Sequence, residues 1–328
     1  MPVHYDITHT TVYRYGSPVT FGEHRVMFRP RDSHDQRVLA TDLQVSPQAT
    51  VRMIQDPHSN SVALVTPLGE ANELKITCSF TIEHAQSSFP ELQLSPSALI
   101  FPFAYSVEER FDLEHYMRPH LDDPEGVLTH WARQFIRTDG PTGTRDLLLN
   151  MNQFIRDNFG YAARDEEGTQ TPLATIRLGT GSCRDFALLM MEAVRRLGIA
   201  TSFVSGYLYD PTLDADAQSA ADNGQSQGQG QGNESGAVGI ASTVGAAGTA
   251  STVGAGATHA WLQAYLPGAG WVTFDPTNNL LGGNELIRVG VARDPSQASP
   301  ISGSWFGAAN AYQGMSATVQ VRRLSGSD

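Results

Sequence analysis

The chain has 328 residues and a formal net charge of −12 at pH 7, with 22 Lys and Arg residues against 34 Asp and Glu residues. This length allows two domains that each bury a core, and the acidic balance argues against nucleic acid, whose phosphates require clustered Lys and Arg. The two cysteines, Cys78 and Cys183, are too few for a disulfide framework or a four-thiolate zinc site.

The apolar runs and the first residues indicate a soluble chain. The apolar runs fall far short of the roughly 20 residues that span a bilayer. The first ten residues lack the basic and apolar regions of a secretory signal. We therefore expect a cytoplasmic protein with no membrane partner.

The N-terminal third has the pattern of β-strands. In residues 74–82, apolar and polar side chains alternate without a break, the period of a half-buried strand. Cys78 lies on the apolar side of this pattern, which predicts core packing and not catalysis. Further strands are predicted at residues 10–15, 39–45 and 61–65, with turn residues between them. Residues 1–115 are therefore predicted to form an antiparallel, sandwich-like β domain.

Helical periodicity begins after residue 124. Residues 125–137 and 145–159 carry apolar residues three and four positions apart, and residues 183–197 carry the clearest apolar stripe, which ends at Gly198. Downstream strands are predicted at residues 200–208, 259–266 and 271–275, the last two joined as a hairpin. We therefore assign residues 116–324 to an α+β domain.

A low-complexity segment interrupts this second domain at about residues 211–257. It consists almost entirely of Gly, Ser, Gln and Ala, and such a composition cannot bury enough apolar surface to offset the entropy of ordering. We predict a flexible insertion between two strands, with an active-site lid as the less favoured alternative.

Cys183 is the candidate nucleophile. It follows Gly179-Thr-Gly181-Ser182 at the start of the clearest helix, where Ser182 is a candidate N-cap and Asp185 can complete a capping box. A thiol on the first helical turn faces unpaired amide N–H groups and the positive end of the helix dipole, which favour the thiolate. The same amides can hold the oxyanion of a tetrahedral intermediate.

The thiolate needs a partner that takes and returns a proton, and His259 is favoured among ten histidines. His259 opens a predicted strand and shares one side of it with Trp261. Asp275 ends the next strand of the hairpin, where it can fix the imidazole. Counted through a four-residue loop, however, Asp275 falls opposite Leu262, about 10 Å along the strand from His259. A tighter turn or a bulge would bring the pair into register.

Structural alternatives exist for each of these residues. Cys183 could be a core cysteine, His259 a polar residue at a strand end, and Asp275 the cap of a turn. For the whole protein, the same three side chains could bind zinc, or the chain could be a scaffold that keeps them without activity. Their order on a helix start and a hairpin favours a thiol triad over a metal site.

The motifs resemble those of the bacterial transglutaminase-like superfamily, which has a papain-like core. They are Gly-Thr-Gly-Ser-Cys183-Arg-Asp-Phe-Ala, Gly206-Tyr-Leu, His259-Ala-Trp261 and Gly270-Trp-Val-Thr-Phe-Asp275-Pro-Thr. The resemblance covers roughly residues 140–325, and Tyr13-Arg-Tyr15, Pro18 and Arg29-Pro30-Arg31 resemble the β domain that precedes this core in many bacterial members. Two features depart from the family: the long insertion, and residues 56–60, which lack the glycine often seen before the Asn.

The resemblance implies a fold and a set of site residues. It implies a helix bearing the cysteine packed on an antiparallel sheet, with Cys183, His259 and Asp275 as the triad. It also places Tyr161 beside the nucleophile, although a core aromatic is an equal alternative for that residue. Tyr161, Ser182 and Trp261 are the candidates for the substrate cleft or the oxyanion site.

These observations predict a cysteine-dependent amide-bond enzyme that acts on a protein or peptide through a thioester. Hydrolysis by a peptidase or a protein amidase or deamidase is favoured, because no sequence feature indicates a second site for an amine. The alternatives are a protein-glutamine transglutaminase and a catalytically silent scaffold. We expect no cofactor and no metal, and the chain lacks the D-x-[DN]-x-[DN]-G calcium loop, unlike calcium-dependent animal transglutaminases.

Overall fold

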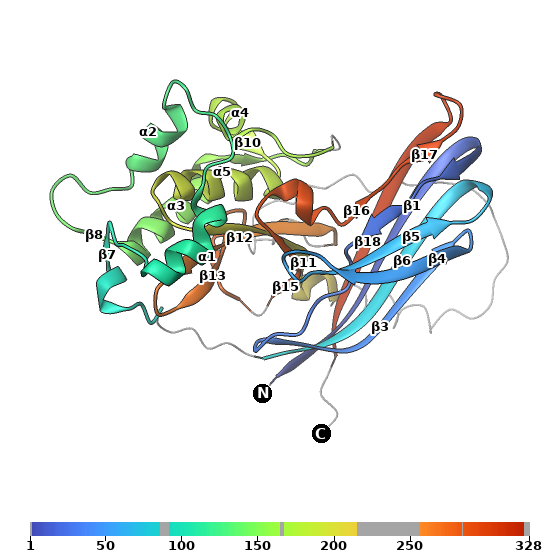
Figure 1. Ribbon diagram of the computed structural model, residues 1–328, viewed down its shortest axis with the longest axis horizontal. Coiled ribbons are helices and arrows are strands. Elements are labelled where there is room, and N and C mark those ends of the chain that lie inside the picture. Colours follow the sequence, from blue (N-terminus) through green and yellow to red (C-terminus); the bar gives the residue numbers. More distant parts are fainter. Residues whose placement is uncertain are drawn as a thin grey trace.

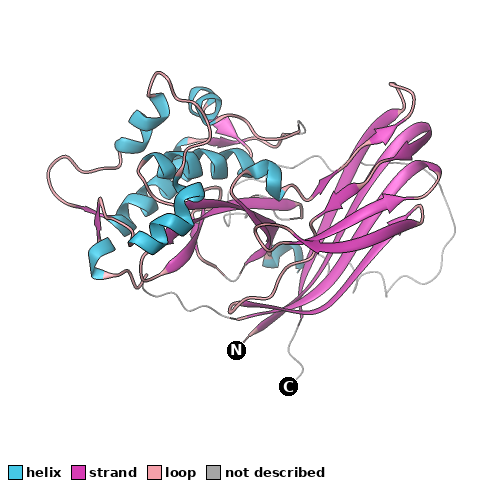
Figure 2. Cartoon of the chain, viewed as in Figure 1, coloured by secondary structure: helices cyan, strands magenta, loops and turns pink. Residues whose placement is uncertain are grey.

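The computed structural model describes residues 2–85, 92–164, 167–214, 253, 256–283 and 285–324. The helices gather at one side of the molecule, and the long strands of a β-sandwich form the other side (Figures 1 and 2). This arrangement confirms the predicted α+β class with a β-rich domain first in the chain.

The sandwich consists of two antiparallel sheets. In one sheet the strand order is β17-β1-β6-β3, with β18 also paired to β1, and in the other it is β16-β2-β5-β4. The bounds are β1 Val3–Phe21, β2 His24–Val26, β3 Gln36–Ser46, β4 Ala49–Gln55, β5 Ser61–Pro67, β6 Glu70–His84, β16 Ile301–Ser302, β17 Trp305–Phe306 and β18 Tyr312–Leu324.

Strand β6 follows the alternation predicted from the sequence. Its apolar residues from Leu74 to Ile82 lie in the core between the sheets, and its intervening residues are half-buried or exposed. Cys78 is one of these core residues, as predicted, and burial raises the pKa of its thiol to about 11. The thiol therefore stays protonated at neutral pH.

The turn at residues 56–60 explains one departure from the resembled family. The Asp56 carboxylate accepts hydrogen bonds from the backbone amides of His58 and Asn60, both at 2.9 Å. Ser59, inside this turn, has a φ of 63°. That is the left-handed conformation in which glycine is favoured, so the serine occupies the position where the family often has a glycine.

The last strands of the chain belong to the sandwich. Strand β16 pairs with β2, β17 pairs with the end of β1, and β18 pairs with β1 from His4↔Leu324 to Tyr15↔Tyr312. The sheet pairing thus differs from the predicted boundary, which assigned all of residues 116–324 to the second domain. The physical reason is that β1 needs a partner on the edge that β6 leaves open, and the returning chain supplies it.

The other half of the molecule contains helices α1 to α5 and a sheet in the order β14-β13-β12-β11-β15. The helix bounds are α1 Val107–Met117, α2 Val127–Arg133, α3 Thr144–Asn158, α4 Pro172–Leu178 and α5 Cys183–Arg196, with 3₁₀ turns η1 Pro96–Ala98 and η2 Pro295–Ala298. The sheet strands are β11 Thr201–Leu208, β12 Thr258–Leu266, β13 Gly270–Asp275, β14 Leu280–Leu281 and β15 Leu286–Ala292. Short pairs join β7 Ile100–Phe101 to β8 Thr142–Gly143, and β9 Gly160–Tyr161 to β10 Thr180–Gly181.

Helix α5 forms the centre of the helical core. Its apolar stripe packs with the alternate residues Ala260, Leu262 and Ala264 of β12, as expected for a helix lying on a sheet. Strands β11 and β15 contribute Tyr207 and Ile287, which are paired with each other, to the sandwich core. The two halves therefore share buried apolar surface.

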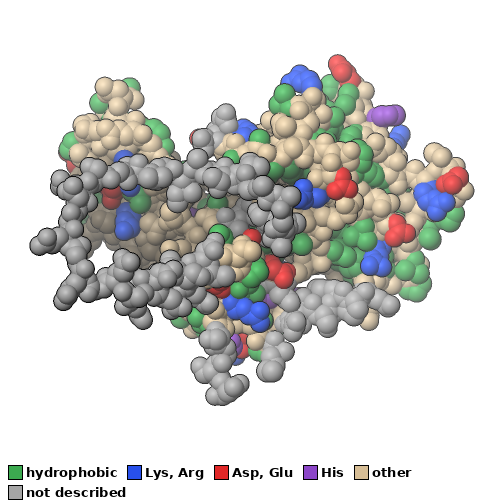
Figure 3. Space-filling view, turned by 180° about the vertical axis from the view of Figure 1, so that it is seen from behind, with side chains coloured by type: hydrophobic (Ala, Val, Ile, Leu, Met, Phe, Trp, Pro, Cys, Tyr) green, Lys and Arg blue, Asp and Glu red, His purple; other side chains and the backbone are tan. Residues whose placement is uncertain are grey.

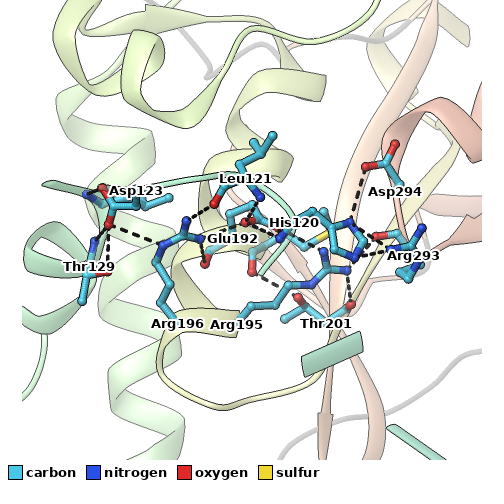
Figure 4. Close-up of polar contacts among 12 residues, drawn as sticks. His120, Leu121, Asp123, Thr129, Glu192, Arg195, Arg196, Thr201, Arg293 and Asp294 are labelled. Carbon is cyan, nitrogen blue, oxygen red and sulfur yellow. Dashed lines mark hydrogen bonds and ion pairs between the residues drawn. The ribbon is translucent and has the colours of Figure 1, made fainter. Parts of the chain in front are cut away.

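Buried charges fix the C-terminal end of α5 (Figure 4). The Glu192 carboxylate accepts hydrogen bonds from Arg195 at 3.0 Å and Arg196 at 2.8 Å, and from the backbone amide of His120. Arg195 also donates to the carbonyl oxygens of Thr201 and Arg293. Thr201 is the first residue of β11, and Arg293 directly follows β15. Because Glu192, Arg195 and Arg196 are all paired and hydrogen-bonded, this network holds α5 in one orientation against the sheet.

The predicted insertion at 211–257 falls almost entirely outside the described residues. Among the residues that are described, no helix combines the length and apolar character needed to cross a membrane. On the face of the molecule seen in Figure 3, acidic and basic side chains are interspersed. A mixed face of this kind is unlike the continuous basic surface that nucleic acids require.

Candidate active site

Cys183 is the first residue of α5, and its side chain is 6% exposed. The thiol therefore lies on the first helical turn, as predicted. Here the amide N–H groups have no acceptor within the helix, and the helix dipole presents its positive end. Both features favour negative charge on the sulfur and on an oxygen bound beside it.

Asp185 anchors the start of this helix. Its fully buried carboxylate accepts hydrogen bonds from the Ser182 amide at 2.8 Å and the Ser182 hydroxyl at 2.9 Å. It also accepts from the Gln170 amide at 2.6 Å and from Arg164 Nη1 at 2.9 Å. Burial raises the pKa of Asp185, but these donors outweigh burial and hold the pKa below its usual value.

The structure gives Ser182 a different role from the one predicted. Its amide and its hydroxyl both donate to Asp185, and the residue is buried. Contact with substrate or with an oxyanion would require one of these donors to turn away from a buried carboxylate. The expectation of a cleft residue is therefore corrected: Ser182 positions the start of α5.

The hairpin of β12 and β13 brings His259 to Asp275. Leu266 pairs with Gly270 and Leu262 pairs with Phe274, so the loop has three residues instead of the four assumed from the sequence. Gly268 and Gly270 have φ values of 90° and 72°, which permit the tight turn. This register moves Asp275 by one position, onto the side of the sheet that carries His259. His259 Nε2 then lies 2.8 Å from Asp275 Oδ2.

The charge state of this pair follows from its surroundings. Both side chains are completely buried. Burial lowers the pKa of His259, but the Asp275 charge, the hydrogen bond between them and the Cys183 thiol raise it to about 10. Burial raises the pKa of Asp275, and the His259 charge, with other donors, lowers it below its usual value. The stable form is therefore an imidazolium held by a carboxylate.

The second ring nitrogen of His259 is the one available to Cys183. Nε2 is occupied by Asp275, and Nδ1 has no hydrogen-bond partner of ordinary geometry among the described residues. The Cys183 thiol is close enough to interact with the imidazole and to raise its pKa. The imidazole thus lies between the thiol and the carboxylate.

This order also tests the zinc alternative. A metal ion bound by all three side chains would need the thiol and the carboxylate on the same side of the imidazole, but the carboxylate is already hydrogen-bonded at Nε2. The described residues contain no group of three or more His, Cys, Asp or Glu side chains placed to share an ion. The geometry fits proton transfer between thiol and imidazole.

Asn278 is a supporting residue that was not predicted from the sequence. Its Nδ2 donates to Asp275 Oδ2 at 2.9 Å, and the Thr277 amide donates to Oδ1 at 2.9 Å. Asn278 also exchanges two hydrogen bonds with the backbone of Val253. In the sequence, the only indication of Asn278 was its place three residues after Asp275. Arg164 and Gln170, the long-range partners of Asp185, showed no sequence pattern that would predict their pairing with it.

Tyr161 lies beside the nucleophile, as the resemblance implied. Strand β9 pairs in parallel with β10, so that Tyr161 is opposite Gly181, two residues before Cys183. The ring is 42% exposed, which excludes the alternative of a core aromatic. Burial, followed by the charge of Cys183, raises the pKa of its hydroxyl to about 12. The hydroxyl is therefore protonated and can donate a hydrogen bond.

Trp261 is buried and supports the imidazole. It is 1% exposed, and its ring centroid lies 5.9 Å from that of His259 at an interplanar angle of 33°. Gly206 makes room for it, because a Cβ at that position would lie 2.7 Å from Trp261 Cη2. The expectation that Trp261 lines an open cleft is therefore corrected: the indole packs against His259 inside the protein.

Comparisons with known proteins agree with this architecture. A model of the bacterial transglutaminase-like N-terminal region matches residues 5–83, and a model of the transglutaminase-like superfamily matches residues 129–276. An uncharacterised protein of Mycobacterium leprae is 25% identical over 321 residues, which cover 97% of this chain and 98% of that protein. An uncharacterised protein of Mycobacterium tuberculosis H37Rv is 25% identical over 313 residues, which cover 91% and 86%.

A solved structure shares the whole fold. It is a crystal structure from Cytophaga hutchinsonii of a protein provisionally assigned as a cysteine protease, with a TM-score of 0.66 and 18% identity. The match covers 100% of this chain and 93% of that chain, and at this identity it concerns the fold alone. The two family models place residues 129–276 in the transglutaminase-like superfamily and match residues 5–83 to the N-terminal region of its bacterial members.

Proposed function

We propose that the protein is a cysteine-dependent enzyme that cleaves amide bonds through a thioester, with Cys183 as nucleophile, His259 as proton carrier and Asp275 as the group that orients it. The observation that carries the proposal is the place of the imidazole. Its Nε2 is held by Asp275 at 2.8 Å, and this leaves Nδ1 for the Cys183 thiol. A thiol, an imidazole and a carboxylate in this order form the arrangement that activates a nucleophile.

The first half of the reaction uses the charged form of the pair. The Cys183 thiolate attacks the carbonyl carbon of the amide, a C–S bond forms, and the carbonyl oxygen becomes an oxyanion. The His259 imidazolium then gives its proton to the amide nitrogen, the C–N bond breaks, and an amine leaves. The product on the enzyme is a thioester, and His259 is left neutral.

The oxyanion needs hydrogen-bond donors that are fixed before the reaction. The Cys183 amide is at the first position of α5 and has no acceptor within the helix. The protonated Tyr161 hydroxyl is the second donor we assign, because Tyr161 lies beside the nucleophile and is partly open to solvent. The buried Ser182 is left as a positioning residue.

Water completes the reaction that we favour. Neutral His259 takes a proton from water, the resulting hydroxide attacks the thioester carbon, the C–S bond breaks and the thiolate returns with the imidazolium. This makes the protein a peptidase or a protein amidase or deamidase acting on a protein or peptide. An amine in place of water would make it a transglutaminase, and a screen with added amine separates the two.

Alkylation tests the activated thiol without a known substrate. Cys183 should react with iodoacetamide near pH 6 at least about tenfold faster than a free model thiol, because the helix start and the imidazolium favour the thiolate. Cys78 provides the control within the same chain, since it is buried with a pKa near 11 and should remain unlabelled. Peptide mapping by mass spectrometry gives both rates. A Cys183 rate equal to that of the model thiol would refute the activation.

Substrate screening tests the chemistry itself. Wild type and Cys183→Ala are compared for ammonia release and peptide cleavage on Gln- and Asn-containing peptides, with and without an added primary amine. Product that depends on Cys183 and contains no amine supports hydrolysis. Product that persists in Cys183→Ala places the chemistry elsewhere, and an activated Cys183 with no product from any peptide favours a different acyl substrate.

A further inference from the structure

A cavity of about 340 Å³ lies where the sandwich, helix α1 and the sheet of the other half meet. Arg31 and His58 reach it from the sandwich. Ser202 and Gln263, which are directly opposite each other on β11 and β12, line it from the sheet. The volume is that of a pocket for a small molecule or for one long side chain.

This cavity is separate from the Cys183 site. Gln263 is four residues from His259 on the same strand, which places it ~13 Å along β12 on the same side of the sheet. Trp261 lies between them and is buried. A group bound in the cavity therefore cannot reach the thioester that forms at Cys183.

Aromatic rings form one side of the cavity. Tyr116 and Tyr265 both contact Trp271, with centroids 5.2 and 5.5 Å from it and interplanar angles of 72° and 76°. Nearly perpendicular rings make the walls of a box, whereas parallel rings would close into a stack. Trp271 is 37% exposed, so the box is open to solvent. Boxes of this type hold ammonium groups, because the electron-rich ring faces attract a cation.

Two carboxylates of α1 stand beside the rings. Glu109 already accepts a hydrogen bond from the Tyr265 hydroxyl at 3.3 Å and one from the Ser106 amide. Asp112 also lines the cavity, and no hydrogen bond or ion pair of its side chain is found within the described residues. Arg31 offsets one of the two negative charges, and its Nη1 donates to the His58 carbonyl oxygen. Arg31, Arg195 and Arg293 all act on the Tyr116 hydroxyl, whereas Glu109 acts on that of Tyr265, so the negative side of the cavity lies at Tyr265 and the α1 carboxylates.

An unpaired polar group lies in the cavity floor. The Ser202 side chain is completely buried, and its hydroxyl has no hydrogen-bond partner among the described residues. A buried hydroxyl without a partner costs free energy, and because this one has no exposed surface, a ligand in the cavity reaches it only when the surrounding side chains move.

From the ring box and the unpaired Asp112, we propose that this cavity is a binding site for an alkylammonium group. The ammonium lies against Trp271, Tyr116 and Tyr265 with Asp112 as its counter-ion. Two sources can present this group: a free small amine, or the side chain of a lysine in a polypeptide. The site neither requires Cys183 chemistry nor supplies it.

Calorimetric titration at constant ionic strength tests the proposal. The probes are n-butylammonium and its neutral analogue N-butylacetamide, added to the whole chain. We expect saturable binding of the cation and none of the neutral analogue. Asp112→Asn and Trp271→Leu should each weaken binding by about fivefold or more. Glu114→Gln, a matched loss of one charge on the same helix outside the cavity, should leave binding unchanged.

The source of the ligand is read with Nα-acetyl-lysine methylamide. Tighter binding than n-butylammonium assigns the site to a lysine in a polypeptide, and equal or weaker binding assigns it to a small amine. The proposal is overturned by the absence of saturable binding, by equal binding of the neutral analogue, or by equal affinities in Asp112→Asn and wild type. Melting temperature and Cys183 alkylation rate are measured on each variant, so that a folding defect or a failure of the proposed catalysis is recognised separately.

Discussion

Asp275 controls His259 through both its charge and its position. Asp275→Asn keeps an acceptor for the Nε2–H of His259 and removes the negative charge. The pKa of His259, raised to about 10 in the wild type, should then fall by about one unit or more. In the proposed mechanism the imidazolium is the proton donor, and it is lost as pH rises through this pKa, so the high-pH limb of activity should move to lower pH. An NMR titration of the imidazole ring protons measures the shift directly.

Asp275→Ala separates the two contributions. It removes the orienting hydrogen bond as well as the charge, and turnover should fall further, on the order of 10²- to 10⁴-fold. If the titration midpoint of His259 in Asp275→Asn equals that of the wild type, then the carboxylate does not set the charge state of the imidazole.

The sequence could name Cys183, His259 and Asp275 as candidates, and the structure brings His259 to Asp275, but their register could not be predicted. Motif order and residue type indicated Cys183, His259 and Asp275 because a thiol nucleophile needs those groups. The strand alternation was also right. The error lay in the loop, where Gly270 pairs with Leu266 and shortens the turn by one residue. Because side chains alternate, one residue decides which side of the sheet a residue faces.

At the scale of elements, the start of α5 depends on a carboxylate two residues after Cys183 that takes no part in the proposed proton transfer. Burial raises the pKa of Asp185, and the Ser182 and Gln170 amides and Arg164 lower it below its usual value. A lowered folded-state pKa gives stabilisation that is present above the unfolded value and is lost as pH falls through the folded value. Asp185→Asn should therefore cost about 2–4 kcal/mol at neutral pH. Urea unfolding should show this cost shrinking as the pH falls below about 4.

Asp139→Asn is the matched control. Asp139 also pairs with an arginine, Arg137, at 3.1 Å, but both side chains are mostly exposed. Exposed pairs are screened by water and contribute little, so this variant should unfold like the wild type at each pH. Equal stability of Asp185→Asn and Asp139→Asn would contradict an anchoring role for Asp185.

The elements missed from the sequence lack the pattern on which prediction depends. Helix α1 exposes Val107 and Phe111, at 82% and 81%, and buries Leu113 as its one core residue. Its apolar residues therefore form no stripe towards the core. The short helix α4 has seven residues, about two turns, too few to show a period. The longer α3 buries one continuous side, and α5 is buried at every position from Asp185 to Arg195. Their predicted bounds differ from the observed ones by a single residue.

At the scale of the whole molecule, the chain closes on itself. Strand β1 begins at Val3, and β18, its neighbour, ends at Leu324. Most side chains of β18 are exposed, and Val319 is its one buried residue. Met315, Ala317, Val319 and Val321 alternate with polar residues, which is typical of a strand, but the weak burial of this side gives no indication of which strand is its partner. Pairing across such a separation is decided by the rest of the sheet and not by local sequence.

The shared core leads to a prediction about unfolding. Tyr207 and Ile287 belong to strands of the half that contains α5 and pack in the sandwich core, so neither half can open without exposing surface of the other. In the Cys183→Ala variant, Cys78 is the remaining thiol, and because it is buried in the sandwich it reacts with a short labelling pulse only when the sandwich opens. The far-ultraviolet helix signal reports the other half, where the helices gather (Figure 2). The two urea midpoints should coincide.

Ile287→Ala tests whether the shared core is the cause of that coupling. Truncation of this fully buried side chain should destabilise by about 2–4 kcal/mol and move both midpoints together. Val51→Ala, at a largely exposed position of β4, removes apolar atoms of similar kind and should move neither. Labelling of Cys78 at a urea concentration where the helix signal is intact would show that the sandwich opens alone. Independent opening would mean that Ile287 and Tyr207 bury surface without linking the two halves, and in that case Ile287→Ala would shift one midpoint and leave the other in place.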